Sequence, residues 1–215
     1  MRIHSVVFDL DGTLFDTKSG ILQCLRAAAD RFGVDTSILS DWVIGPPAEE
    51  SAKRLMPGRS DAVRNEFLAA YRNEYSRNGW LQSTPYPGIL SLIHWLRDHR
   101  IQIFICTSKR MDLTLKLLRH FQVEENFVAI AADDPSLKSH DKKDLLENLI
   151  AEQRIDVSRC VMIGDSTYDV EGAHATGMKV IAALYGYGTR EELIGSGPDA
   201  MCESPSELRR ILDTL

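Results

Sequence analysis

The fold of this chain is decided by the stretch Val6-Val7-Phe8-Asp9-Leu10-Asp11-Gly12-Thr13-Leu14. Its β-branched and aromatic start predicts a buried strand, and the glycine ends that strand directly after two aspartates. The two carboxylates therefore crowd one edge of the predicted strand. Because like charges so close together repel, the pair needs a neighbouring cation or a proton on one member. Either arrangement is useful in catalysis, although Asp-Gly is also a common turn pair.

The composition is that of an ordinary globular protein. The chain has 215 residues, which suffices for one large domain or for a domain with an insertion. A formal net charge of -6 argues against a nucleic-acid partner. No apolar run approaches the roughly 20 residues of a membrane helix, and the start does not resemble a secretory signal. We therefore expect a cytoplasmic protein without a membrane partner, either a monomer or a homodimer.

Residues 18–82 predict an all-helical segment. Apolar side chains recur at helical spacing from Ile21 to Phe32, and a second clear helix is predicted over residues 60–77. No convincing strand lies between them. The turn-forming run Pro85-Tyr86-Pro87-Gly88 then marks a hinge.

From residue 89 onward the pattern alternates between helix and strand. Strands are predicted at 101–106, 127–132, 160–163 and 179–184, and helices at 89–98, 110–121, 142–153 and 167–176. Capping boxes are expected at Thr189 with Glu192 and at Ser204 with Glu207. Such alternation implies an α/β protein with a parallel sheet that is flanked by helices. Ligands bind such sheets beyond the carboxyl ends of the strands, so residues 18–82 would hang over that edge as a lid.

Acidic side chains follow two of the predicted strands. Asp9 and Asp11 follow the first, and Asp165 follows a later one, with Asp169 four residues on. Four carboxylates in one cleft demand a hard cation with oxygen ligands. Mg²⁺ fits best, since no loop has the ligand spacing to encircle Ca²⁺. A helix cap is the plainer explanation of Asp165 and Asp169.

A phosphate-binding group is expected beside these acids. Thr107 and Ser108 end a strand where the next helix begins, which is a natural anion site, although Ser108 also suits a helix cap. A lysine would complete the site by neutralising phosphate and nucleophile. Among Lys138, Lys142 and Lys143, the start of a predicted helix favours Lys142.

These residues, taken together, resemble the motifs of the haloacid dehalogenase superfamily. The matching motifs are Asp9-Leu10-Asp11-Gly12-Thr13, Thr107, Lys142 and Gly164-Asp165-Ser166-x-x-Asp169. Two further elements are similar to the phosphoglycolate phosphatase-like hydrolases of that superfamily, namely Gly45-Pro46-Pro47 and Gly186-Tyr187-Gly188. The lysine motif departs from the usual Lys-Pro form, so Lys138 and Lys143 stay open as alternatives.

The resemblance implies both a fold and an activity. The fold is a Rossmann-like catalytic core, residues 1–17 and 83–215, with an inserted helical cap, residues 18–82. The activity is Mg²⁺-dependent hydrolysis of a small, phosphoglycolate-like phosphate monoester through an aspartyl phosphate. The partner is thus a small phosphorylated metabolite.

The resemblance also implies a role for each site residue. Asp9 would be the nucleophile, and Asp11 would protonate the leaving alcohol and then take a proton from water. The catalytic set is Asp9, Asp11, Thr107 and Lys142. The phosphate-binding set is Gly12, Thr107, Ser108 and Lys142. The metal-binding set is Asp9, the backbone carbonyl of Asp11, Asp165, and Asp169 as a ligand through water or as a support.

Several alternative functions use the same core. A phosphomutase of the β-phosphoglucomutase type differs only in the cap, and a 5'-nucleotidase or pyrophosphatase belongs to the same hydrolase class. A dehalogenase is disfavoured because that branch lacks the acid found here as Asp11. A non-enzymatic protein that binds a phosphate ligand is disfavoured by the intact set of Asp9, Asp11, Lys142 and Asp165.

Overall fold

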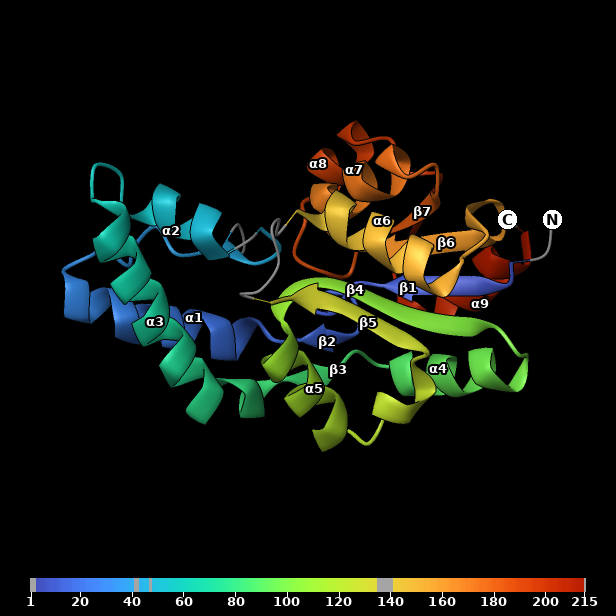
Figure 1. Cartoon of the computed structure of the whole chain (residues 1–215), viewed down its shortest axis with the longest axis horizontal. Helices are drawn as coiled ribbons and strands as arrows, with labels where there is room; N and C mark the ends of the chain where they lie inside the picture. The colour runs from blue at the N-terminus through green and yellow to red at the C-terminus, as the bar shows by residue number, and fades with distance from the viewer. Residues whose placement is uncertain (1–2, 41–42, 47, 135–140, 215) are drawn as a thin grey trace.

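A computed structural model describes residues 3–40, 43–46, 48–134 and 141–214. Its layered α/β part carries both ends of the chain, and helices α1, α2 and α3 stand to one side of that part (Figure 1). The α-helices are α1 (Lys18–Phe32), α2 (Ala48–Leu55), α3 (Asp61–Arg77), α4 (Ile89–Asp98), α5 (Met111–His120), α6 (Lys142–Gln153), α7 (Thr167–Ala175), α8 (Arg190–Gly195) and α9 (Pro205–Thr214). Short 3-10 turns occur at Gly79–Gln82, Glu124–Asn126 and Val157–Arg159. The predicted α/β class is confirmed.

The central layer is a parallel sheet, as the alternating pattern predicts. Within the described residues its six strands have the order β5-β4-β1-β6-β7-β8. Their bounds are β1 (Ser5–Phe8), β4 (Gln102–Arg110), β5 (Ala129–Asp133), β6 (Cys160–Gly164), β7 (Lys179–Ala183) and β8 (Ala200–Cys202). Phe8 is level with Ile105 of β4 and with Ile163 of β6. The residues that follow these three therefore emerge side by side where the strand order reverses, the usual ligand site of such sheets.

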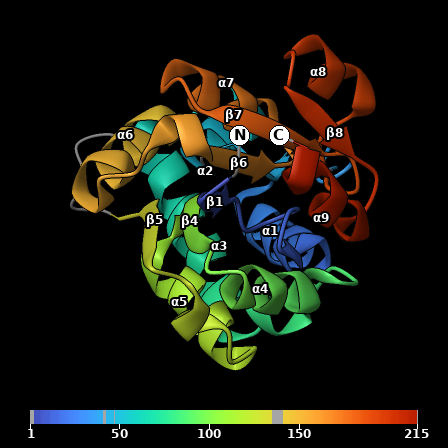
Figure 2. The ribbon, with the colours of Figure 1, turned by 90° about the vertical axis from the view of Figure 1, so that its right-hand side faces the viewer.

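The first strand is buried on both faces because its side chains enter two different hydrophobic clusters. Val6 and Phe8 pack on one face with side chains of α4, α5 and α9, whereas Val7 packs on the other with side chains of α6 and α7. Figure 2 views the sheet from its end, with α6 and α7 on one side and α4 and α5 on the other. An uninterrupted apolar strand is what a doubly covered parallel sheet requires.

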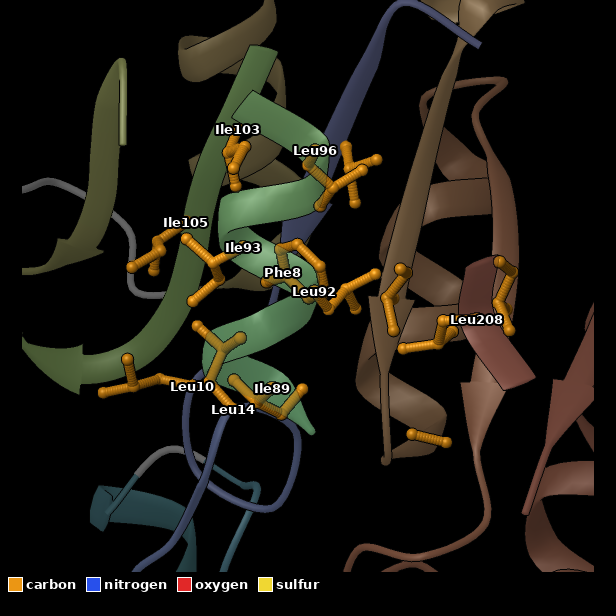
Figure 3. Packing of buried hydrophobic residues seen from close by; sticks show 14 of the residues in the cluster. Phe8, Leu10, Leu14, Ile89, Leu92, Ile93, Leu96, Ile103, Ile105 and Leu208 are labelled. Carbon is orange, nitrogen blue, oxygen red and sulfur yellow. The ribbon is translucent and has the colours of Figure 1, made fainter. Parts of the chain in front are cut away.

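Helix α4 supplies much of the packing on the face of Phe8. Its buried side chains are Ile89, Leu92, Ile93 and Leu96. Figure 3 shows these four beside Phe8, Ile103 and Ile105 of the sheet. The spacing of three and four residues places them on one stripe of the helix, which buries that stripe against β1 and β4.

Helices α1, α2 and α3 have a hydrophobic cluster of their own. Leu25 of α1, Leu55 of α2 and Phe67 of α3 are buried in it, together with Leu113 from α5. We call these three helices the cap. The described residues between 18 and 82 contain helices and turns and no strand, as expected. The exact boundaries of cap and core stay a prediction.

Two linker strands join the cap to the sheet part. They are β2 (Phe15–Asp16) and β3 (Thr84–Pro85), which pair antiparallel, so the chain leaves and re-enters the core side by side. The Tyr187 hydroxyl lies on this junction, where it accepts hydrogen bonds from the amides of Thr17 (2.7 Å) and Lys18 (3.0 Å). The loop around Gly186-Tyr187-Gly188 therefore fixes the start of α1.

Several local expectations differ from the structure. Strand β4 continues past Cys106 to Arg110, with a register shift after Thr107, and β8 follows no strand pattern in the sequence. The capping box of Thr189 forms, but Glu207 accepts the amide of Glu203 instead of that of Ser204. Pro47 and Lys138 lie outside the described residues. Edge strands and caps depend on tertiary neighbours, which explains these differences.

We predict that Ile93→Ala lowers the free energy of unfolding by about 2–5 kcal/mol, the usual cost of deleting a fully buried aliphatic side chain. Ile93 is 0% exposed between α4 and the sheet. Urea unfolding followed by circular dichroism measures the effect. The matched control is Ile194→Ala on α8, which is 52% exposed and should change stability by less than about 0.5 kcal/mol. Equal losses in both variants would contradict this packing.

Candidate active site

Two residues 133 positions apart in the sequence meet at the carboxyl edge of the sheet. Lys142, the first residue of α6, places its Nζ 2.6 Å from Oδ1 of Asp9 and 3.0 Å from the backbone carbonyl of Cys106. Both side chains are almost completely buried. Lys142, which the sequence favoured, therefore lies beside Asp9, whereas Lys143 is about half exposed and pairs with Glu147 on the surface. The catalytic role of Lys142 stays a prediction.

Asp169 joins the same lysine from the other side. Its Oδ1 lies 2.9 Å from Lys142 Nζ, while its Oδ2 accepts hydrogen bonds from the amide (3.0 Å) and the hydroxyl (2.7 Å) of Ser166. Ser166 and Asp169 thus form a capping box at the start of α7. The explanation of Asp169 as a helix cap is therefore correct for one carboxylate oxygen, while the other oxygen faces Lys142 and its functional role stays a prediction.

Asp165 is held by a frame of close backbone and hydroxyl groups. Its carboxylate accepts hydrogen bonds from the Thr13 hydroxyl (2.9 Å) and the Tyr187 amide (2.8 Å). A Cβ on Gly12, which has φ of +91°, would stand 2.1 Å from Asp165 Oδ2, and one on Gly186 would stand 2.4 Å from it. The two glycines are required because any side chain at either position would displace this carboxylate.

The site contains more buried negative charge than positive. Burial raises the pKa of Asp9 to about 7, with Asp169 and Asp11 adding to the rise and Lys142 opposing it. Burial, with Asp9 and Asp169 nearby, also raises the pKa of Asp165 well above its usual value. For Lys142, burial would lower the pKa, but Asp169 and Asp9 more than offset this and raise it. One ammonium does not balance three carboxylates, so the cluster favours a further cation.

The residues present fit a divalent metal ion. Asp9, Asp165 and Asp169 each offer an oxygen, and the three oxygens lie within 4.8 Å of one another. Oδ1 of Asp169 is completely buried and, among the described residues, has no hydrogen-bond partner despite its charge pairing with Lys142. A set of carboxylate oxygens is what Mg²⁺ prefers. The backbone carbonyl of Asp11 as a further ligand stays a prediction.

The residues predicted to bind phosphate lie near the carboxyl edge of the sheet, and their present contacts differ. Thr107 is buried, and its hydroxyl accepts the amide of Lys109 (3.2 Å). Ser108 is half-buried beside the cavity described below and caps no helix, since α5 begins only after Arg110. The Gly12 amide already donates to the carbonyl of Phe15 (2.9 Å). Phosphate binding by these three stays a prediction.

Lys109 is the site residue that sequence reasoning missed. Its Nζ donates to both carboxylate oxygens of Asp11, at 3.0 and 2.9 Å, and to the hydroxyl of Tyr75 in α3, at 3.0 Å. Burial would lower the pKa of this ammonium, but Asp11 and the nearby tyrosines raise it above its usual value. The available signal was a lysine directly after the polar pair that follows the predicted strand 101–106.

A cavity separates this edge of the sheet from the cap. The core contributes Asp9, Asp11, Thr107 and Lys109 to its lining. The cap contributes mainly apolar side chains, among them Leu25, Leu55, Phe67 and Leu68, together with Tyr71, Arg72 and Tyr75. Ile44, from the segment before α2, also lines the cavity. Arg72 is paired with Glu49 of α2 at 2.6 Å. A substrate bound here would lie between the acidic cluster and the cap.

Comparison with known families agrees with the motifs. A family profile described as "Haloacid dehalogenase-like hydrolase" matches residues 6–183, most of the chain. That range includes Asp9, Asp11, Lys142, Asp165 and Asp169. The chain therefore belongs to the haloacid dehalogenase-like hydrolases.

Individual relatives refine this placement. A phosphoglycolate phosphatase from Mesorhizobium japonicum is 31% identical over 192 residues, which cover 86% of this chain and 84% of that protein. The solved structure of a predicted phosphatase from Clostridium acetobutylicum superimposes with a TM-score of 0.94 at 28% identity and covers 100% of both chains. Within the family, the chain is thus similar to the phosphoglycolate phosphatases.

A third relative carries a different name. The tyrosine-protein kinase PtkA from Mycobacterium tuberculosis is 35% identical over 185 residues, which cover 85% of this chain. The matched region spans only 62% of the length of PtkA.

In the part of the chain that the structure describes, no helix is both long and apolar enough to cross a membrane.

We predict that the metal-free protein, kept free of metal by EDTA, loses stability as the pH rises. The pKa of Asp9 is raised from 3.8 to about 7, so the protonated group stabilises the fold below about pH 4, and this contribution disappears as the pH rises through about 7. Mg²⁺ at one fixed concentration, a hundred times its Kd at pH 8, should raise Tm by about 5–10 °C at pH 8 and by much less at pH 5.

Thermal unfolding monitored by circular dichroism, with EDTA or with Mg²⁺, measures this dependence. Asp9→Asn, which cannot ionise, is the control and should show a weaker loss of stability with pH. An identical pH profile for both proteins would show that Asp9 is not the group responsible.

Proposed function

We propose that this chain is a Mg²⁺-dependent phosphatase that hydrolyses a small phosphate monoester through an aspartyl phosphate on Asp9. The observation that carries the proposal is the contact of Lys142 with Asp9 (2.6 Å) inside a cluster that also holds Asp165 and Asp169. A nucleophilic carboxylate, a neutralising ammonium and a carboxylate set for Mg²⁺ are the parts that phosphoryl transfer needs.

The first step transfers the phosphoryl group to the protein. A carboxylate oxygen of Asp9 forms a bond to phosphorus while the ester P–O bond on the opposite side breaks. Asp11 gives a proton to the oxygen of the leaving alcohol, so that a neutral alcohol departs. Asp11 is left as a carboxylate beside Lys109, whose ammonium stabilises that charge.

The second step returns the protein to its starting state. Water attacks the phosphorus of the aspartyl phosphate, Asp11 takes a proton from this water, and the bond between Asp9 and phosphorus breaks. Inorganic phosphate leaves, and Asp11 again carries the proton for the next turnover. Lys142 supports both steps because its ammonium lies beside the oxygen of Asp9 and can offset charge on a bound phosphoryl group.

The metal site has a defined place in this scheme. Asp9, Asp165 and Asp169 would hold Mg²⁺, and the ion would supply charge stabilisation for the phosphoryl oxygens. The raised pKa of Asp9 supports this assignment, because a nucleophile that is half protonated near neutrality gains from a neighbouring cation.

The substrate is proposed to be small and phosphoglycolate-like, as the resemblance to phosphoglycolate phosphatases suggests. A cavity beneath the cap, with Leu55 and Phe67 in its lining, is where such a molecule would bind. A panel of metabolite phosphates decides between this substrate and a nucleotide, a pyrophosphate, or a sugar phosphate that is isomerised. Cytoplasmic location and oligomeric state stay predictions.

We predict that Asp9→Asn lowers phosphatase activity by about 10⁴-fold or more, because the nucleophile is lost. Release of inorganic phosphate from p-nitrophenyl phosphate measures turnover. Acid-quenched protein should carry one phosphoryl group, labile to base, on the peptide that contains Asp9, and the variant should carry none. Full turnover in the variant, or a phosphoryl group on another residue, would refute the mechanism.

We further predict that Lys142→Met lowers activity by about 10²- to 10³-fold, the usual effect of removing one charge-stabilising group. The matched control is Lys143→Met, which removes a lysine from the next position but faces solvent. It should change activity by less than about twofold. The opposite ranking of the two variants would assign the lysine role to Lys143.

A further inference from the structure

Lys109 is a buried lysine that has neither the nucleophile nor the metal cluster as its partner. It lies near the end of β4, and its side chain is 5% exposed. Its ammonium can donate three hydrogen bonds, and the structure shows three acceptors, namely both carboxylate oxygens of Asp11 and the Tyr75 hydroxyl. A lysine that is fully committed inside the cavity is not a solvated surface charge.

Asp11 depends on this lysine for its orientation. Among the described residues, Lys109 is the side chain that hydrogen bonds to the Asp11 carboxylate, and it reaches both oxygens. Asp11 stands directly before Gly12, whose φ of +91° marks a sharp turn of the chain. The side chain of Asp165 is held by two separate donors, whereas that of Asp11 is held by the ammonium of Lys109.

Lys109 is in turn held by the cap. Tyr75 comes from α3, and besides its hydroxyl contact its ring lies under the ammonium, with Nζ 4.5 Å from the ring centroid. Tyr75 is itself 1% exposed. Since α3 belongs to the cap and Asp11 belongs to the core, the contacts form one chain across the boundary, from Tyr75 through Lys109 to Asp11.

We propose that Lys109 is a positioning residue for Asp11, and that Tyr75 makes its placement depend on the cap. Tyr75 of the cap contacts the ammonium through its hydroxyl and its ring, and the ammonium in turn holds the Asp11 carboxylate in the lining of the cavity, where the leaving alcohol would lie. Proton exchange by Asp11 then depends on the contact between Tyr75 of the cap and Lys109. This inference rests on the proposed phosphatase function, in which Asp11 exchanges the proton.

A double-mutant cycle of Lys109→Met and Asp11→Asn tests whether the lysine acts through Asp11. The substrate is phenyl phosphate, whose poor leaving group requires a proton donor. Asp11→Asn should lower kcat by about 10²- to 10⁴-fold, the usual contribution of an acid–base group. Lys109→Met should lower kcat by about 10- to 100-fold with KM changed by less than about threefold, as for a lost hydrogen bond to a charged group.

The decisive measurement is Lys109→Met in the Asp11→Asn background. There we expect a further loss of no more than about twofold, because a residue that only positions Asp11 has nothing left to position. An equal loss in both backgrounds overturns the inference and shows that Lys109 acts on the substrate itself. A rise in KM with kcat unchanged overturns the inference in the same way.

Lys116→Met is the matched control. Lys116 also ties α5 of the core to α3 of the cap, with Nζ 2.6 Å from the carbonyl of Ser76 and 4.6 Å from the ring centroid of Trp80, but it does not line the cavity. It should change kcat by less than about twofold in either background. A loss as large as that of Lys109→Met would assign the effect to cap attachment in general and overturn the inference.

Tyr75→Phe keeps the experiment decisive if Lys109→Met does not fold. This variant removes one hydroxyl and retains the ring beneath the ammonium, and it should lower kcat by about two- to tenfold in the parent and not in the Asp11→Asn background.

If Asp9→Asn and Asp11→Asn both retain full activity, the proposed function itself fails. If they lose activity and the cycles are additive, only the role of Lys109 is rejected.

Discussion

The structure depends on the meeting of three buried carboxylates with one buried ammonium at the centre of the sheet. An isolated buried charge is strongly unfavourable, and a buried pair is tolerated only with good geometry and further hydrogen bonds. Lys142 meets this requirement through Asp9, Asp169 and the carbonyl of Cys106. The remaining negative charge is what makes the cluster a site for a cation rather than a simple ion pair.

The surrounding fold serves to bring these groups together and to exclude water. The register of β1, β4 and β6 makes Phe8, Ile105 and Ile163 level, so the chain turns into the site at neighbouring points. Hydrophobic clusters cover both faces of β1, so water does not reach the strand that leads to Asp9 from either face. Backbone approach at Gly12 and Gly186 then closes the frame around Asp165.

The acidic groups of the site form ion pairs with two different lysines. Lys142 serves Asp9 and Asp169 within the core, and Lys109 serves Asp11 at the boundary with the cap. The carboxylate that would carry the phosphoryl group and the one that would carry the proton therefore have separate counter-charges.

The sequence by itself determined the α/β class, and it predicted the helical segment after residue 17 and the residues Asp9, Lys142 and Asp165 that the structure brings together. These follow from local rules, because strand and helix periodicity and motif spacing are properties of short stretches of chain. The start of the predicted helix also favoured Lys142 over its neighbour Lys143, and Lys142 is the one that is buried.

Only the tertiary structure decided how the cap takes part in the site. The contact of Lys109 with Asp11 joins residues 98 positions apart, and the contact with Tyr75 joins a helix of the cap to a strand of the core. No local pattern reports such contacts, because they depend on how two separately packed hydrophobic clusters come to face each other. For the same reason the extension of β4 to Arg110 and the edge strand β8 were not visible in the sequence: their hydrogen bonds are supplied by strands that are distant along the chain.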